Sequence, residues 1–242
     1  MAEGIVTHID RASVDMDRAV AQHAAYVAAL AGAGWTIHEV APAEELPDSA
    51  FVEDAVVVCD ELAVLTRPGA PERRPEVAGA EQAARELGLE IAWIDAPGSL
   101  DGGDVLQVGT TVYVGHGGRT DGEGIRQLRR HLAPRGRTVM PVPLGRVLHL
   151  KSAVTALPDG TLIAHDPALV DAAVLPTLRF VPEEGGSHAV LLGDGAVLMA
   201  ASAPRSAELV DDLGFDVVTA EIGEFEKMEG CVTCLSVLVV RT

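Results

Sequence analysis

The feature that most constrains the fold of this chain is a repeated order of apolar patterns. Four pairs of short, alternating apolar runs are each interrupted by a polar turn that often contains Asp and Gly. Turns of this kind between alternating runs indicate β-hairpins, and the hairpins begin about 40 to 50 residues apart. The predicted hairpins cover Phe51–Leu65, Asp104–Gly115, Leu148–Ala164 and His188–Ala200.

Between the hairpins the apolar period changes to that of a helix, and each predicted helix is followed by a short apolar strand. The helices are predicted at Asp15–Ala31, Glu76–Leu87, Gly122–Leu132, Pro167–Leu175 and Arg205–Leu213. The strands after them are predicted at Trp35–Val40, Glu90–Ile94, Thr138–Val142, Leu178–Val181 and Phe215–Thr219. Because one such unit leaves a face unburied, we expect a single closed α/β domain of five quasi-repeats over residues 1–242.

The predicted repeat does not close at the ends of the chain. A last strand is predicted at Cys231–Val240 with no hairpin partner after it, and the first helix has no hairpin before it. Since residues 2–14 are polar and loop-like, we expect a fifth unit that lacks its N-terminal strand. An exposed strand edge favours pairing with another chain, so a homodimer is an open alternative.

Composition limits the partners of the chain. The formal net charge is −18, from 18 Lys and Arg against 36 Asp and Glu, so we expect no nucleic-acid partner, whereas a small cationic substrate would suit this field. We expect no membrane role, because there is no signal peptide and no apolar run of the roughly 18 residues that span a bilayer. The three cysteines, Cys59, Cys231 and Cys234, cannot form a closed disulfide set, which favours the reducing cytoplasm.

Carboxylates stand out at the starts of two predicted hairpins. Asp101 and Asp104 flank two glycines in the motif LDGGD, which is typical of a tight turn and also able to present a carboxylate. Glu53 and Asp54 are adjacent in an apolar strand, so one of them must point inward. Because a buried carboxylate needs a partner, the pair indicates either an internal salt bridge or a socket for a cation.

A histidine and a thiol complete the set of candidate groups. His149 lies in an apolar run and is typical either of a core histidine or of an acid and base. Cys231 and Cys234 have the spacing of a redox or zinc pair, but a strand rather than a helix is predicted after them and no second ligand pair follows. If successive units converge on one axis, the carboxylates, His149 and Cys234 would face one channel as orienting acids, base and nucleophile.

Six motifs in order along nearly the whole chain resemble dimethylarginine dimethylaminohydrolase, a family in the guanidine-modifying superfamily of five-bladed α/β propellers that also contains the arginine deiminases. The motifs are Asp48–Asp54 (DSAFVED), Thr66–Arg74 (TRPGAPERR), Leu100–Leu106 (LDGGDVL), Arg119-Thr120 with Gly124, Leu148–Ser152 (LHLKS) and Gly230–Ser236 (GCVTCLS). The resemblance implies a hydrolase of free methylated arginine that releases citrulline and an alkylamine and requires no metal or organic cofactor.

The resemblance also implies roles for individual residues. It makes Cys234 the nucleophile, His149 the acid and base, and Asp101 the acid that supports it. The substrate-binding residues that it implies are Asp48, Glu53, Asp54, Arg73 and Arg119, with Asp54 on the guanidinium and the two arginines on the α-carboxylate. An enzyme that acts on unmethylated arginine shares these motifs and remains an alternative, as does a non-catalytic binder of arginine derivatives.

Overall fold

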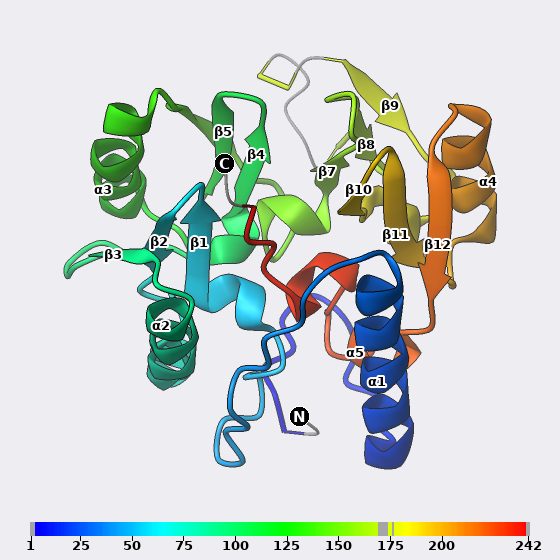
Figure 1. Cartoon of the computed structure of the whole chain (residues 1–242), viewed down its shortest axis with the longest axis horizontal. Helices are drawn as coiled ribbons and strands as arrows, with labels where there is room; N and C mark the ends of the chain where they lie inside the picture. The colour runs from blue at the N-terminus through cyan, green and yellow to red at the C-terminus, as the bar shows by residue number, and fades with distance from the viewer. Residues whose placement is uncertain (1–2, 169–173, 176, 241–242) are drawn as a thin grey trace. The chain divides into compact units, whose positions relative to one another are not determined.

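The computed structural model describes residues 3–168, 174–175 and 177–240 and contains four three-stranded sheets (Figure 1). In each sheet an antiparallel hairpin is joined by a parallel third strand, which pairs with the second strand of the hairpin. The predicted α/β class, the four hairpins and the order of hairpin, helix and strand are therefore confirmed for most of the chain.

Most elements lie close to the predicted ranges, but two hairpins begin later than predicted, the first at Val56 and the third at Val154. Glu53 and Asp54 therefore lie on a 3-10 turn and not in the predicted strand. The first two sheets contain β1 (Val56–Cys59), β2 (Leu62–Leu65), β3 (Glu90–Trp93), β4 (Val105–Val108), β5 (Thr111–His116) and β6 (Thr138–Pro143). The other two contain β7 (Val154–Ala156), β8 (Leu162–Ala164), β9 (Leu178–Phe180), β10 (Val190–Gly193), β11 (Ala196–Ala200) and β12 (Asp216–Ala220). The helices are α1 (Met16–Gly32), α2 (Val77–Glu86), α3 (Gly122–Leu132), α4 (Pro204–Asp212) and α5 (Gly223–Glu226).

The chain divides into two compact units, and the unit that matters here comprises residues 38–144, 148–151 and the segment from Cys234. Its hairpin β1–β2 is buried on both faces. Val57 and Val64 belong to an apolar cluster with α3, whereas Val56 and Leu65 belong to another with α2. Because successive strand residues face opposite ways, each helix covers one face of the hairpin. These strand positions therefore carry apolar residues throughout.

A short 3-10 turn comes before the first strand in each of the four sheets, with at most two residues between turn and strand. The turns η1 (Val52–Ala55), η3 (Gly102–Asp104), η5 (Leu150–Ser152) and η6 (Glu184–Ser187) precede β1, β4, β7 and β10 respectively. A fifth turn, η7 (Val232–Leu235), occurs near the C-terminal end. The carboxylates, the histidine and the thiol that the sequence analysis singled out lie on these turns or next to them.

Two of the predicted strands are wrong. Trp35–Val40 contains no strand, and Cys231–Val240 forms η7 followed by residues without regular secondary structure. Both belong to the closing unit of the predicted repeat, and residues 3–14 also form no strand. A lone strand would leave its backbone N–H and C=O groups without ladder partners, which is costly. Instead, Val237 and Val239 pack against the apolar cluster of α2 and β1.

The predicted helix at Pro167–Leu175 falls largely on residues 169–173, which lie outside the described residues. Among the residues that are described, no helix combines the length and the apolar character needed to cross a membrane.

Candidate active site

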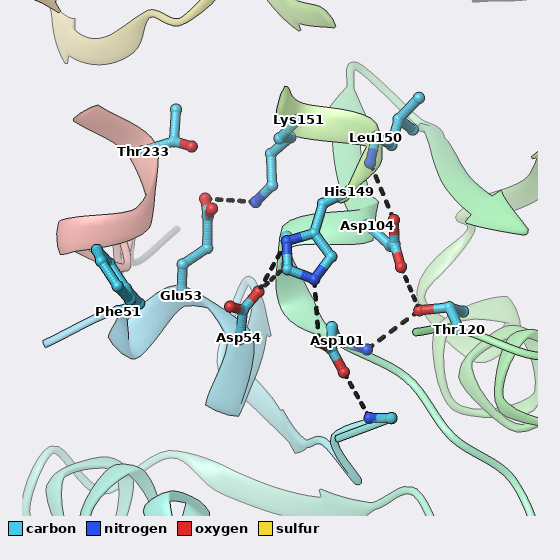
Figure 2. Close-up of polar contacts among 12 residues, drawn as sticks. Phe51, Glu53, Asp54, Asp101, Asp104, Thr120, His149, Leu150, Lys151 and Thr233 are labelled. Atoms are coloured by element: carbon cyan, nitrogen blue, oxygen red, sulfur yellow. Dashed lines mark hydrogen bonds and ion pairs between the residues drawn. The ribbon is translucent and has the colours of Figure 1, made fainter. Parts of the chain in front are cut away.

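His149 lies between two buried carboxylates of the same compact unit (Figure 2). Its Nε2 atom is 2.9 Å from Oδ2 of Asp101, and its Nδ1 atom is 3.7 Å from Oδ1 of Asp54. The side chains of all three residues are at most 6% exposed. Because an apolar core histidine does not need two carboxylates, this arrangement favours the acid–base interpretation of His149.

The charges of this cluster stabilise a protonated imidazole. Burial by itself would lower the pKa of His149, but the facing carboxylates, Asp54 foremost, outweigh burial and raise the pKa to about 10. Burial would also raise the pKa of Asp54, yet His149 and Arg73 outweigh it and hold that pKa below its usual range. The cluster therefore favours the charged imidazolium, the form that can donate a proton.

Asp54, Asp101 and His149 could also be considered as a metal site, since one ligand atom from each lies within 4.8 Å of the others. The polar atoms of this cluster already have other partners. Nε2 of His149 is hydrogen-bonded to Asp101, and the two oxygens of Asp54 accept from the N–H of Gly103 and from Arg73. The arrangement fits proton transfer better than metal binding.

The two glycines of the LDGGD motif make this close packing possible. A Cβ atom on Gly103 would lie 2.6 Å from Oδ1 of Asp54 and 2.7 Å from Nδ1 of His149. A Cβ atom on Gly102 would lie 1.9 Å from the backbone oxygen of Glu53. The N–H of Gly103 also donates to Oδ1 of Asp54 at 2.8 Å. The motif is therefore more than a turn, because it lets the backbone reach both the carboxylate and the imidazole.

Arg73 is buried and donates in several directions. Its Nη1 donates to Oδ2 of Asp54, and its Nη2 donates to Glu76 at 2.7 Å. Nη2 also donates to the backbone oxygens of Asp48 and Phe51, at 3.2 and 3.1 Å. The internal salt bridge that was one alternative for Asp54 is thus confirmed. Glu76 was not among the predicted site residues, although its position three residues after Arg73 on a helical segment is a signal for such a pair.

Glu53 is paired with Lys151, another residue that sequence analysis did not single out. The Nζ atom of Lys151 lies 2.5 Å from Oε1 of Glu53, and Figure 2 shows the lysine extending from η5 toward the carboxylate. Their side chains are 15% and 9% exposed. Lys151 belongs to the LHLKS motif, which offered the only signal for it. The carboxylate of Glu53 is therefore already paired with a cationic side chain, which is the internal salt bridge that was one of the two alternatives for Glu53 and Asp54.

A third buried aspartate, Asp104, is hydrogen-bonded to the residue that follows His149. Its carboxylate accepts a hydrogen bond from the backbone N–H of Leu150 at 2.9 Å and one from the hydroxyl of Thr120 at 2.5 Å. Burial raises the pKa of Asp104 to about 7, despite the opposing effects of His149 and of these hydrogen bonds. Asp104 belongs to the LDGGD motif but was not among the predicted site residues.

The remaining predicted residues lie on the turns and connections of the fold. Cys234 lies on η7 and is half-buried, whereas Cys231 is buried, with its Sγ atom 3.3 Å from Oγ1 of Thr233. Asp48 is buried, and Arg119 immediately precedes Thr120 in the connection from β5 to α3. The structure thus joins His149, Asp54 and Asp101 in one cluster. The roles of Cys234, Asp48, Arg73 and Arg119 in binding or attacking a substrate stay predictions.

No family model matches the chain, but individual relatives do. It is 56% identical over 237 residues to the N(G),N(G)-dimethylarginine dimethylaminohydrolase of Streptomyces coelicolor, covering 98% of this chain and 92% of that protein. The chain belongs to the dimethylarginine dimethylaminohydrolase family. The dimethylarginine dimethylaminohydrolase of Pseudomonas aeruginosa is 34% identical over 229 residues, which cover 92% of this chain and 89% of that protein. The resemblance of the six motifs is thereby confirmed.

Solved structures of dimethylarginine dimethylaminohydrolase share the fold. A cysteine-to-serine variant of the Pseudomonas aeruginosa enzyme, complexed with citrulline, matches with a TM-score of 0.90 at 32% identity, over 97% of this chain and 92% of that one. The product-bound N-terminal domain of a cyanobacterial arginine dihydrolase matches with a TM-score of 0.85 at 24% identity, over 94% of this chain and 88% of that one. The second likeness shows that the α/β fold extends beyond the family.

Proposed function

We propose that this member of the dimethylarginine dimethylaminohydrolase family hydrolyses the guanidinium group of free N-methylated arginine to citrulline and methylamine or dimethylamine. The observation that carries the proposal is the imidazole of His149 held between the carboxylates of Asp54 and Asp101. Identity of 56% to the Streptomyces coelicolor enzyme over nearly the whole chain supports it independently.

The chemistry of the reaction accounts for the residue types in the site. A guanidinium is planar and cationic, so the carboxylate of Asp54, with Glu53 beside it, can hold it through hydrogen bonds. The thiolate of Cys234 attacks the central carbon and forms a tetrahedral adduct. The imidazolium of His149 then gives its proton to the departing amine as the carbon–nitrogen bond breaks, which leaves a thiouronium on the sulfur.

The neutral imidazole then completes the turnover. It takes a proton from a water molecule that attacks the thiouronium carbon. The second tetrahedral adduct then expels the thiolate, loses its hydroxyl proton to solvent and leaves as citrulline. Because Nε2 of His149 is paired with Asp101, Nδ1 is the nitrogen that exchanges the proton on the side of Asp54. Arg119 binds the α-carboxylate of the substrate, and Asp48 lies at its amino-acid end. The predicted role of Arg73 on the α-carboxylate does not fit, because Arg73 is buried and paired with Asp54, the residue proposed for the guanidinium. No step requires a metal or an organic cofactor.

The wider organisation of the chain belongs to the same proposal. The five recurring turns, η1, η3, η5, η6 and η7, support one catalytic domain over residues 1–242 with five propeller units, in which η7 begins the fifth. The three free thiols support a reducing compartment such as the cytoplasm. Light scattering of the purified chain decides between a monomer and a homodimer, which the sequence leaves open.

Citrulline release from dimethylarginine and from arginine, measured side by side, tests the function. We expect faster release from dimethylarginine. Cys234→Ser should lose activity by about 10⁴-fold or more, because a coupled nucleophile and base fail together. Cys231→Ser is the matched control and should retain most of the activity. Faster release from arginine would identify an arginine hydrolase, and binding without turnover would identify a non-catalytic binder.

A further inference from the structure

The carboxylate of Asp104 connects the backbone on both sides of the catalytic pair. One oxygen accepts the N–H of Leu150, the residue directly after His149, at 2.9 Å. The other accepts the hydroxyl of Thr120 at 2.5 Å, and that hydroxyl accepts the backbone N–H of Asp101 at 3.1 Å. Figure 2 shows this continuous path from Leu150 through Asp104 and Thr120 to Asp101.

The fold makes room for this connection. Asp104 is fully buried and Thr120 is 1% exposed. A Cβ atom on Gly115 would lie 2.4 Å from Oδ1 of Asp104, so a larger residue in β5 would displace the carboxylate. A buried carboxylate is costly without partners, and both oxygens of Asp104 have them. The Asp104 carboxylate is therefore a specific part of the site, although none of these hydrogen bonds reaches the imidazole of His149.

We propose that Asp104 and Thr120 are positioning residues that set the distance and angle between His149 and Asp101. This inference rests on the proposed hydrolase function for its kinetic consequence. The Asp104 carboxylate fixes the turn that carries His149, and the Thr120 hydroxyl fixes the backbone that carries Asp101. Asp101 and His149 lie beside η3 and η5, which precede different sheets. Hydrogen bonds that connect the two turns therefore keep the two side chains at a fixed distance during the proton transfers.

Substitution of Thr120 separates positioning from folding. Thr120→Val keeps the volume and leaves the N–H of Asp101 without its acceptor, so we expect kcat to fall by roughly 10- to 100-fold with KM within about twofold. Thr120→Ser keeps the hydroxyl and should restore most of kcat. Thr138→Val, at an exposed position of β6, is the matched control and should match the unaltered protein. Asp104→Ala removes both bonds and should lose at least as much kcat as Thr120→Val.

A second measurement tests the inference apart from the reaction. In a nuclear magnetic resonance titration of the His149 imidazole, Thr120→Val should shift the ring resonances and lower the pKa, whereas Thr120→Ser and Thr138→Val should not. If the unaltered protein releases no citrulline, the hydrolase proposal fails and this titration alone decides the positioning role. Unchanged His149 resonances in Thr120→Val, or a Thr120→Ser variant as impaired as Thr120→Val, would overturn the inference.

Discussion

Replacing Asp101 by Asn tests the central feature of the site, the charged hydrogen bond to His149. One oxygen of Asp101 accepts the N–H of Gly69 at 2.8 Å, and the other lies 2.9 Å from Nε2 of His149. In Asp101→Asn the carbonyl oxygen must stay with Gly69, because that N–H needs an acceptor. The amide nitrogen then faces Nε2 and can only donate. The imidazolium loses its partner on Nε2, and the neutral ring is held in the opposite tautomer.

The expected loss follows from these two effects. A hydrogen bond to a charged group contributes about 1.5–3 kcal/mol, which is roughly 10- to 150-fold in rate. A wrong tautomer costs more, since the corresponding Asp-to-Asn change in a Ser-His-Asp triad lowers kcat by about 10⁴-fold. We therefore expect kcat for dimethylarginine to fall by more than about 100-fold. KM should change little, because Asp101 supports His149 rather than the substrate.

Citrulline release at saturating substrate measures the loss, and a thermal unfolding curve confirms that the variant is folded. Asp60→Asn is the matched control: Asp60 has a φ of 55° in the β1–β2 turn, a conformation that Asn tolerates well, and its partner is the surface residue Arg137. That control should keep its activity. A loss below about tenfold in a folded Asp101→Asn variant would refute the role assigned to the His149–Asp101 pair.

Three further predictions concern packing, substrate binding and pH. Gly103→Ala should abolish most activity and lower the melting temperature, because the new Cβ would lie 2.7 Å from Nδ1 of His149. Gly32→Ala is the control, because its Cβ would have no neighbouring atom within 4 Å, and it should change neither activity nor melting temperature. Arg119→Ala should raise KM by roughly 10- to 100-fold, more than it lowers kcat, because a charge-assisted contact with the substrate is lost. The exposed Arg126→Ala is the control. Equal losses for alkylguanidines without a carboxylate would contradict the assignment. Because the pKa of His149 is raised from 6.5 to about 10, its contribution to the free energy of unfolding is complete below about pH 6.5 and is lost as pH rises through 10. Urea unfolding should therefore show the stability difference between the unaltered protein and His149→Gln shrinking over that range, and a constant difference would contradict the raised pKa.

Sequence periodicity predicted the hairpins and most helices because their burial leaves a regular trace. The strands β1 and β2 alternate between two apolar clusters, and α3 is amphipathic. The failures occurred at Trp35–Val40 and Cys231–Val240, where an apolar run is present and the described structure offers no ladder partner. Strand propensity describes a surface that fits a sheet, and it cannot supply the neighbouring strand.

The site was predictable to a similar degree. The motifs identified His149, Asp101 and Asp54, and the structure places these three together. Lys151 and Asp104 could not be assigned from sequence, because their roles depend on partners 98 and 46 residues away in the chain. A lysine or an aspartate in a motif has the same appearance whether it is solvated or buried against a partner. Only the packing of separate turns distinguishes these cases.

The recurring 3-10 turns explain how one repeated unit can assemble chemistry of several kinds. Positions in β1 and β2 are apolar because helices cover both faces of the hairpin, so they leave no place for charged groups. The turn before each hairpin can carry different residues without disturbing the sheet that follows. Asp54 on η1, Asp101 beside η3, His149 beside η5 and Cys234 on η7 lie on or beside four of the five turns. The carboxylate clamp, supporting acid, base and thiol that we propose can thus be exchanged one turn at a time, while the apolar clusters around the strands stay the same.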